Sequence, residues 1–257
     1  MSFRPKKFLG QHFLKDAVTA ERIVSFLSPQ EKNILEIGPG KGILTQFLFQ
    51  KKNYDLKIIE IDNEAIQFLL KKFPERSMDI IQGDFLELNL QKIFSEPFSI
   101  IGNFPYNISS QILFRVLENK DRIEEVVGMF QKEVAERIVS PPGSRDYGIL
   151  SVLMQAFYDL EIVLTLNEED FSPPPKVKSA VVRICRSRKK KLMSDEKIFF
   201  RVVKTAFNQR RKKLSNALSS LIPKNYSADF PYLDFRAEAL SWKQFDEIAF
   251  QVSRISN

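Results

Sequence analysis

Asn33–Gly42 reads NILEIGPGKG, an apolar run that passes directly into a glycine-rich turn. The run Asn33–Ile37 has the length and composition of a buried strand, and the helical run Ile43–Gln50 follows the glycines. Glycines at such a turn let the backbone approach a ligand closely, and the helix N-terminus adds N–H donors. The stretch therefore predicts a ligand-binding turn at the carboxyl edge of an α/β sheet.

Short β-branched runs and amphipathic runs alternate from about residue 33 to residue 186. This alternation is typical of strand–helix–strand units that build a mostly parallel, doubly wound sheet. Two later runs, Leu160–Leu166 and Ala180–Arg186, flank a proline-rich loop and favour an antiparallel hairpin at the sheet edge. We therefore predict an α/β, Rossmann-like fold with a seven-stranded sheet whose last hairpin is antiparallel. The other strands are expected at Leu56–Ile61, Met78–Gln82, Phe98–Gly102 and Glu125–Gln131, and two of the helices at Asn63–Phe73 and Ser109–Glu118.

The C-terminal part follows a different pattern. Residues 186–191, RSRKKK, lack periodicity and indicate a linker. Beyond them, apolar residues recur at helical spacing in Glu196–Phe207, Gln209–Leu221 and Trp242–Ser253. We expect two domains, a catalytic domain over residues 1–187 and a small all-α domain over residues 188–257.

The net charge of +7 is concentrated near the C-terminus. Residues 186–257 hold 16 Lys and Arg against 7 Asp and Glu, a balance of +9, whereas the rest of the chain has a balance of −2. A basic module attached to a near-neutral one can bind phosphates while it leaves a neutral pocket for chemistry. The pattern favours a nucleic-acid partner over a merely solvated basic surface. The candidate RNA-binding residues are Lys189, Lys190, Lys191, Arg210, Arg211, Lys212 and Lys213.

Several classes of protein are excluded by composition. The single cysteine, Cys185, rules out an internal disulfide, and with only one histidine, His12, a zinc site is not expected, so the metal prediction is none. No apolar run approaches the roughly 18 residues of a membrane span. We expect a soluble, cytoplasmic protein without a membrane partner.

Acidic side chains end successive predicted strands. Glu60 lies 22 residues past Gly38, where a carboxylate can accept hydrogen bonds from both ribose hydroxyls. Asp84 follows the third strand and can accept from the amine of a cofactor adenine. Ile43 stands where a dinucleotide fingerprint has its third glycine, which weakens the prediction of pyrophosphate binding. Ribose recognition suits S-adenosylmethionine (SAM) and NAD equally, and an NAD-dependent oxidoreductase is the less favoured alternative.

The fourth predicted strand is followed by Asn103-Phe104-Pro105-Tyr106. The exocyclic amine of adenine is a poor nucleophile, and an Asn oxygen together with a carbonyl before or within the Pro turn can accept both of its protons. This would direct the nitrogen lone pair toward the sulfonium methyl of SAM, a catalysis by orientation. Tyr106 offers a face on which the base can stack, and Phe171, in a proline-rich loop, is the candidate for the opposite face.

The only histidine lies in the N-terminal segment FLGQHFLKD, residues 8–16. Gln11 and His12 are polar groups within an apolar frame, as suits a segment that folds over a cofactor. A structural histidine is the alternative.

These motifs together resemble the ribosomal RNA small-subunit adenine dimethyltransferase family from about residue 6 to residue 257. The strongest matches are residues 8–14, 36–42, 103–106, 131–137 and 171–182. The resemblance implies a SAM-dependent methyltransferase fold and dimethylation of two adjacent adenosines near the 3′ end of small-subunit rRNA. Phe104 stands where the family usually has Leu, and His12 where it often has Asn. Together with the motifs, the resemblance implies cofactor binding by Gln11, His12, Leu14, Gly38, Gly40, Glu60, Asp84 and Asn103.

Two alternatives stay open at this point. Large-subunit adenine methyltransferases that confer macrolide resistance look similar, although residues 131–147 and 171–179 resemble the small-subunit branch more closely. The second alternative is a ribosome-assembly factor or RNA-binding factor in which catalysis is secondary. The expected partner is the small ribosomal subunit with its 16S rRNA, and the expected state is a monomer.

Overall fold

The computed structural model describes residues 4–223 and 230–255. The chain forms two compact units. The first unit holds the residues up to Ala135 together with Glu161–Arg186, and the second holds Glu136–Leu160 together with the residues from Ser187 onward. This division differs from the predicted 1–187 and 188–257, because it assigns residues 136–160 to the second unit. That residues 188–257 act as a domain of their own stays a prediction.

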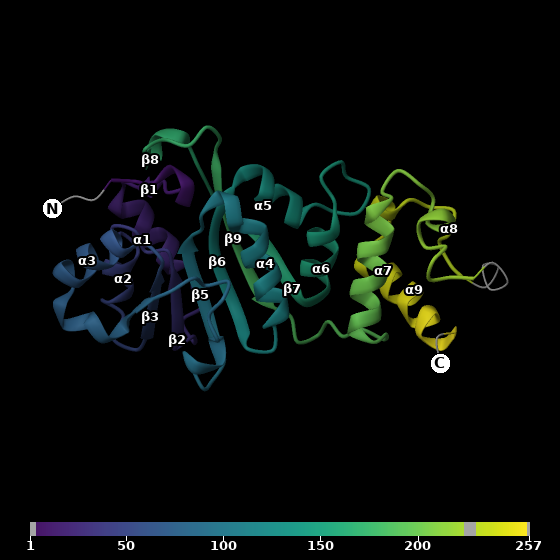
Figure 1. Ribbon diagram of the computed structural model, residues 1–257, viewed down its shortest axis with the longest axis horizontal. Helices are drawn as coiled ribbons and strands as arrows, with labels where there is room; N and C mark the ends of the chain where they lie inside the picture. The colour runs from purple at the N-terminus through teal and green to yellow at the C-terminus, as the bar shows by residue number, and fades with distance from the viewer. Residues whose placement is uncertain (1–3, 224–229, 256–257) are drawn as a thin grey trace. The chain divides into compact units, whose positions relative to one another are not determined.

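A seven-stranded sheet forms the centre of the fold, with the order β4-β3-β2-β5-β6-β9-β7 (Figure 1). The first five strands in this order are parallel, and β9 pairs antiparallel with β6. The predicted Rossmann-like sheet with its antiparallel final pair is confirmed, and β9 lies between β6 and β7. The strands are β2 Asn33–Ile37, β3 Asp55–Glu60, β4 Ile80–Gln82, β5 Phe98–Asn103, β6 Ile123–Gln131, β7 Tyr158–Leu166 and β9 Ser179–Arg186.

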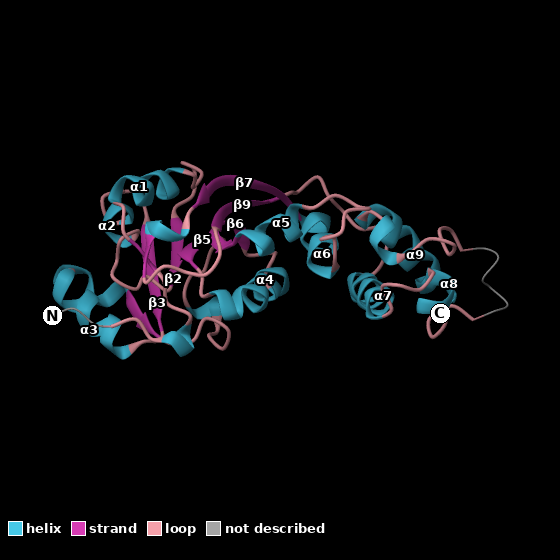
Figure 2. Ribbon diagram, turned by 90° about the horizontal axis from the view of Figure 1, so that it is seen from above, coloured by secondary structure: helices cyan, strands magenta, loops and turns pink. Residues whose placement is uncertain are grey.

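Helices cover both faces of the sheet. Figure 2 shows α1 and α2 on one face and α4 on the other. Their apolar sides pack on strands whose residues are buried almost continuously, as the central strands of a parallel sheet require. In the first unit the helices are α1 Ala17–Ser25, α2 Thr45–Leu48, α3 Asn63–Lys72 and α4 Ser109–Glu118, and α5 Lys132–Val139 crosses into the second.

The second unit is helical, as predicted for the C-terminal part. The predicted helix Gln209–Leu221 is wrong in extent, because only Leu214–Ala217 is helical and a bridge joins Lys213 to Arg236. None of the helices described has both the length and the apolar character needed to cross a membrane. The α-helices of this unit are α6 Ile149–Phe157, α7 Glu196–Asn208, α8 Leu214–Ala217 and α9 Trp242–Ile255.

A small two-stranded sheet was not predicted. β1, Phe13–Leu14, pairs antiparallel with β8, Phe171–Ser172. A further backbone bond joins the N–H of Lys15 to the carbonyl of Asp170, 2.9 Å away. Two-residue strands are too short to leave a periodic signal in the sequence. They fix the N-terminal segment beside the loop that precedes β9.

Candidate functional site

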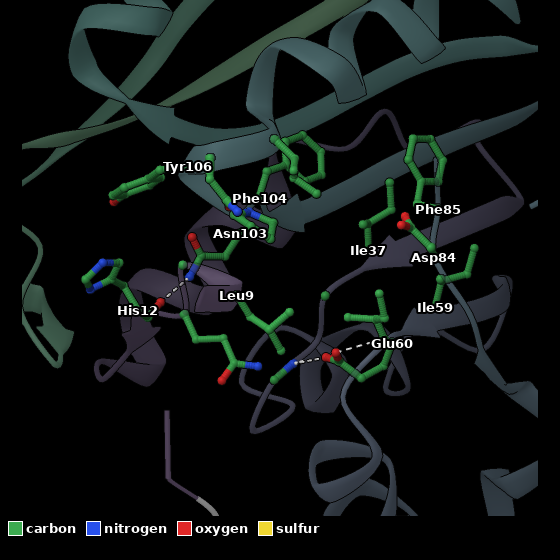
Figure 3. A pocket seen from close by; sticks show the side chains of 18 of the residues that line it. Leu9, His12, Ile37, Ile59, Glu60, Asp84, Phe85, Asn103, Phe104 and Tyr106 are labelled. Atoms are coloured by element: carbon green, nitrogen blue, oxygen red, sulfur yellow. Dashed lines mark hydrogen bonds between the residues drawn. The ribbon is translucent and has the colours of Figure 1, made fainter. Parts of the chain in front are cut away.

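A cavity of about 210 Å³ lies at the carboxyl ends of the parallel strands β2, β3, β4 and β5 (Figure 3). Ligands of open α/β sheets collect at this edge. The N-terminal segment supplies a further wall. The cavity is lined by residues 9–13, 37, 38, 40, 59–61, 83–85 and 103–108.

Glycines form the turn after β2. Gly38 and Gly40 have φ angles of +65° and +55°, which L side chains rarely adopt. A Cβ at Gly40 would lie 2.6 Å from the ring of Phe13, whereas a Cβ at Gly38 would meet only the Asn103 carbonyl, at 3.9 Å. The turn thus combines close packing at Gly40 with open space beside Gly38.

Glu60 ends β3 and is only 4% exposed. Its Oε1 accepts hydrogen bonds from the backbone N–H groups of Ile61 and Asp62, both at 2.9 Å, and its Oε2 accepts from the Gly40 N–H at 3.3 Å. Burial raises the pKa of Glu60, and these three backbone donors counteract the rise. The carboxyl group is held in a fixed orientation at the cavity wall.

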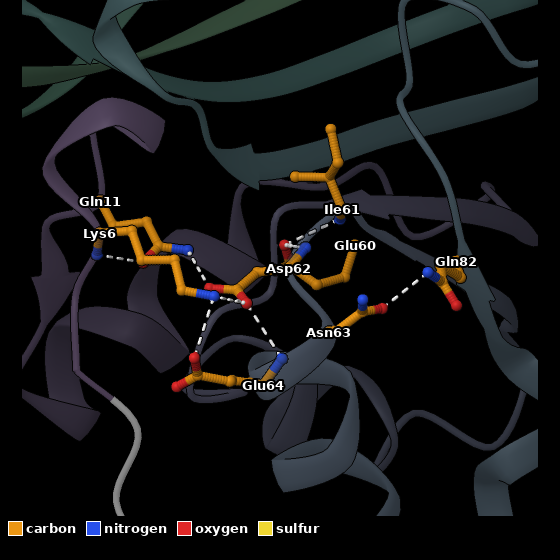
Figure 4. A network of polar contacts seen from close by, with 8 residues as sticks. All are labelled: Lys6, Gln11, Glu60, Ile61, Asp62, Asn63, Glu64 and Gln82. Carbon is orange, nitrogen blue, oxygen red and sulfur yellow. Dashed lines mark hydrogen bonds and ion pairs between the residues drawn. The ribbon is translucent and has the colours of Figure 1, made fainter.

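A polar network beside Glu60 ties the N-terminal segment to α3 (Figure 4). The Asp62 side chain has no exposed surface; its carboxylate accepts from Lys6 Nζ at 2.6 Å, from Gln11 Nε2 at 3.2 Å and from the Glu64 N–H at 3.0 Å. Burial alone would raise the pKa of Asp62, but these hydrogen bonds together lower it. The Lys6 N–H donates to Gln11 Oε1 at 2.9 Å. Both polar ends of the Gln11 side chain are therefore engaged within the protein.

Asn103 ends β5. Its Nδ2 donates to the backbone carbonyl of His12 at 2.6 Å, and Figure 3 shows its Oδ1 directed toward Tyr106. The carbonyl of Pro105 already accepts from the Ile108 N–H at 3.2 Å and from Ser109 Oγ at 3.1 Å. Within the described residues, no hydrogen bond reaches the carbonyl of Phe104, so this oxygen and Asn103 Oδ1 are the available acceptors.

Phe104 itself is a core residue, 1% exposed. Its ring packs edge-on against Phe130, with 5.2 Å between the ring centroids. A Cβ at Gly128 would lie 2.4 Å from this ring, and one at Gly102 would lie 2.8 Å from it. The lack of a side chain at these two glycines thus makes room for the Phe104 ring.

Tyr106 and His12 stack against each other, with 5.4 Å between the ring centroids and 24° between the planes. The Tyr106 hydroxyl is hydrogen-bonded to Ser179 Oγ, and His12 Nδ1 is 2.8 Å from the carbonyl of Pro173. Burial raises the pKa of Tyr106, so its hydroxyl stays protonated at neutral pH.

Most of the predicted cofactor and catalytic residues line the one cavity. Leu14 instead lines a smaller neighbouring cavity, which also contacts Gly38 and Asn103. Phe171 is the other exception: it is 1% exposed and lies in the hydrophobic core with Leu14, whose backbone it pairs with. The structure therefore does not bring the Phe171 ring to Tyr106. Those that line the main cavity are Gln11, His12, Gly38, Gly40, Glu60, Asp84, Asn103, Pro105 and Tyr106.

Sequence reasoning missed several contributors. The apolar side chains of Ile59 and Phe85 line the cavity and were not predicted. Asp84, next to Phe85, was predicted, and its Oδ1 accepts a hydrogen bond from the Leu86 N–H at 2.9 Å. Asp62 was missed although it lies only two residues after Glu60. Lys6, 56 residues away from Asp62, gave no local signal that the two would pair.

Glu36 is a further buried acid that the prediction left without a role. It is 1% exposed, Thr45 Oγ1 donates to its Oε2 at 2.7 Å, and within the described residues its Oε1 has no hydrogen-bond partner. Burial raises the pKa of Glu36 to about 8. The carboxyl group is therefore mostly protonated at neutral pH.

The predicted RNA-binding residues all lie in the second unit and fall into two groups. Three are engaged in ion pairs: Lys190 with Asp159, Arg210 with Glu238, and Lys213 with Asp234, at 2.6, 2.7 and 3.0 Å. Arg210 also donates to the carbonyl of Arg145 at 2.6 Å. The second group is exposed and has no ion pair among the described residues: Lys189, Lys191, Arg211 and Lys212. Lys213 is exposed as well, although it is paired.

Residues 2–232 match the family model described as ribosomal RNA adenine dimethylase. The chain belongs to this family. A protein of Cytophaga hutchinsonii named ribosomal RNA small subunit methyltransferase A is 51% identical over 252 residues, which cover 97% of this chain and 98% of that protein. One of the same name from Parabacteroides distasonis is 52% identical over 248 residues, 95% of this chain and 92% of that one. Membership in the dimethylase family identifies the chain as a SAM-dependent rRNA adenine dimethyltransferase, as the sequence predicted.

A solved structure supports the fold of the family. The dimethyladenosine transferase from Plasmodium falciparum superimposes with a TM-score of 0.81 at 23% identity, over 95% of this chain and 98% of that one. At this identity the likeness confirms the methyltransferase fold only.

Proposed function

We propose that the protein transfers methyl groups from SAM to the N6 amines of two adjacent adenosines in the 3′-terminal hairpin of 16S rRNA, during ribosome biogenesis. The observation that carries this proposal is the fixed orientation of Asn103, whose side-chain oxygen is left available at the cavity beside Tyr106. The names of the relatives at 51% and 52% identity favour the small subunit over the large one.

The cavity fits SAM in the chemistry of its walls. Glu60 presents a carboxyl group suited to a ribose diol, and Asp84 lies beside apolar Ile59 and Phe85, a combination suited to adenine. Open space beside Gly38 lets a ligand approach the backbone. When bound, SAM supplies an electrophilic methyl group on its sulfonium. The other proposed cofactor contacts are Gln11, His12, Leu14, Gly40 and Asn103, of which Gln11 acts by holding the N-terminal segment.

The proposed catalytic step is orientation of the target amine. Asn103 Oδ1 and the Phe104 carbonyl would accept hydrogen bonds from the N–H groups of the amine, so that the nitrogen lone pair is directed at the methyl group. After transfer, S-adenosylhomocysteine is the leaving group and the methylated nitrogen releases one proton to solvent. The same acceptors stabilise the positive charge that develops on nitrogen. Pro105 shapes the turn, and its own carbonyl is occupied by Ile108 and Ser109. No strong general base is required.

The proposed RNA-binding surface is made by the exposed cations of the second unit. Lys189, Lys191, Arg211 and Lys212 are available for phosphates, whereas Lys190 and Arg210 are partly buried in ion pairs and Lys213 pairs with Asp234 on the surface. We assign residues 188–257 as the RNA-binding domain on this basis. The partner is the small ribosomal subunit, and we propose that a cytoplasmic monomer engages it.

The decisive test is methyl transfer in vitro. The purified protein is incubated with SAM labelled in the methyl group and with small subunits that lack the modification, and the rRNA is digested to nucleosides. We expect label in dimethyladenosine. Large subunits are incubated separately. Label in these but not in small subunits, or label in another nucleoside, would refute the proposed substrate.

A further inference from the structure

Phe104, between Asn103 and Pro105, is held both by its backbone and by its side chain. Its N–H donates to the carbonyl of Met129 at 3.2 Å, so the pairing of β5 with β6 continues one residue past the end of β5. Its ring is buried in the core. The Phe104 carbonyl, one of the two acceptors proposed for the target amine, therefore belongs to a residue whose other groups are fixed.

Gly128 lies on β6 directly beside Gly102 on β5. A Cβ at Gly128 would come closer than 3.0 Å to the rings of both Phe104 and Phe130, a distance that real Cβ atoms essentially never show. Gly128 lies within a strand and its φ angle is not positive, so its backbone conformation does not require glycine. A glycine inside a strand often marks a close approach of other atoms. At Gly128 those atoms belong to two side chains.

Gly102 excludes a side chain for a different reason. A Cβ there would lie 2.5 Å from the backbone carbonyl of Ile37 on β2, and the Phe104 ring is only the second obstacle. The backbone of a neighbouring strand cannot give way, whereas a ring can be replaced by a smaller side chain. Gly128 is therefore the position at which space can be exchanged with residue 104, and Gly102 is a reference at which this exchange fails.

We propose that the Phe104 ring and the side-chain-free position of Gly128 form a size-matched pair across β5 and β6, and that this pair positions Asn103 Oδ1 and the Phe104 carbonyl for methyl transfer. The inference rests on the proposed function. The ring of Phe104 is a positioning group, because it acts through the backbone that it anchors. A shift of about 1 Å at a reacting group can lower a rate about 100-fold.

The pair predicts that a change in one member is compensated by a change in the other. Gly128→Ala overpacks the core and pushes the Phe104 ring from its place. Phe104→Leu removes ring atoms and leaves a cavity. In the double variant the Ala side chain enters the space that the Phe104 ring has left, and the ring of Phe130 can turn into the remainder. Residues in contact are coupled, so the two effects should not add.

The test is a double-variant cycle in the whole chain, with methyl transfer to small subunits that lack the modification measured at saturating SAM. We expect kcat to fall about 10-fold to 100-fold in Gly128→Ala and about tenfold in Phe104→Leu, and to return to within about threefold of the unaltered value in the double variant. SAM affinity, obtained by calorimetric titration, should change far less than kcat. Gly102→Ala should not be rescued by Phe104→Leu, because the Ile37 carbonyl remains.

Phe98→Leu is the matched control, since it makes the same change at a fully buried residue at the other end of β5. It should lower the melting temperature, as Phe104→Leu does, and leave kcat unchanged. A loss of kcat in Phe104→Leu no larger than in Phe98→Leu would overturn the positioning role. A double variant no more active than Gly128→Ala would overturn the size match.

The melting temperature is a second readout, and it does not depend on the substrate. It should be lowered in Gly128→Ala and recover in the double variant. If Gly128→Ala does not fold, folding of the double variant supports the size match, and its failure to fold opposes it. Absence of transfer to small-subunit adenosines by the unaltered protein would refute the proposed function, whereas the recovery of melting temperature would still support the pairing of Phe104 with Gly128.

Discussion

Asn103 and His12 are 91 residues apart in the chain, and the side-chain amide of Asn103 donates to the His12 carbonyl across 2.6 Å. This bond determines which end of the amide faces the cavity, because among the described residues the nitrogen is hydrogen-bonded and the oxygen is not. The N-terminal segment thus fixes the orientation of the Asn103 side-chain amide at the end of β5. An acceptor held in advance costs no reorganisation during the reaction.

Asn103→Ala should reduce kcat by about 100-fold to 1000-fold, because it removes one of the two acceptors of the target amine. SAM affinity, measured by calorimetry, should fall far less than kcat, because Asn103 is one of several proposed cofactor contacts. Asn33→Ala is the control, since Asn33 begins β2, at the sheet edge opposite the cavity, and its side-chain amide donates to the Pro97 carbonyl. A kcat of Asn103→Ala near that of the control would remove Asn103 from the mechanism.

Glu60→Gln should weaken SAM binding by about tenfold to a hundredfold, as expected for the loss of hydrogen bonds to a charged group. The amide that replaces the carboxylate also turns an N–H₂ group toward the backbone donors of Gly40, Ile61 or Asp62. Equilibrium titration gives the affinity, and circular dichroism checks the fold. Unchanged affinity in a folded variant would contradict the ribose assignment.

Asp62→Asn should loosen the N-terminal segment and weaken SAM binding about threefold to tenfold, since the charged partner of Lys6 is lost while an oxygen remains to cap α3. Lys6→Met should have a similar effect, and the double variant should add little more. Hydrogen exchange of residues 6–14 measures the loosening. Lys57→Met, which breaks the pair with Asp79 away from the cavity, is the control. Full additivity of the two substitutions would show that Lys6 and Asp62 act independently.

Glu36 should make the protein less stable as the pH rises. Its pKa is raised from 4.5 to about 8, so between these values the folded state holds a proton that the unfolded state has released. The free energy of unfolding should therefore fall by up to about 1.4 kcal/mol per pH unit in this window and level off above it. Glu36→Gln should reduce the decrease of the free energy of unfolding with pH. Urea unfolding from pH 5 to 9 measures it, and equal slopes in both proteins would exclude Glu36 as the cause.

Arg211→Ala with Lys212→Ala should weaken binding of the small subunit and reduce the salt dependence of log K by a slope of about 1.4 to 1.8, the loss of two phosphate contacts. Arg210→Ala with Lys190→Ala should change RNA binding less and thermal stability more, because these partly buried side chains already pair with Glu238 and Asp159. Filter binding over a range of salt concentrations compares the pairs. A larger loss of RNA binding in the variant of the paired cations would show that these cations, and not Arg211 and Lys212, contact the RNA.

The sequence predicts the parts of this site that lie at strand ends. Glu60 and Asn103 end strands with a clear apolar pattern, Gly38 and Asp84 follow such strands, and parallel strands bring their carboxyl ends to one edge. Contacts between distant segments leave no such pattern. The pairing of β1 with β8 buries Phe171, a residue whose neighbouring prolines had suggested an accessible ring.

Side-chain partners were the least predictable feature. The ion pair of Lys6 with Asp62 and the engagement of Arg210 with Glu238 depend on where the backbone places each group. A run of basic residues therefore predicts phosphate binding for the segment. Which of its side chains can contact phosphates depends on the ion pairs that the fold brings about.

The β1–β8 pairing also determines when, during synthesis of the chain, the site can be completed. Phe13–Leu14 is among the first parts of the chain to be synthesised, yet its partner Phe171–Ser172 comes after almost all of the first unit. The wall that carries His12 therefore stays without its support until translation has passed that point. An incomplete nascent chain cannot present the finished site, so competence to act on a ribosome arises only late in the enzyme's own synthesis.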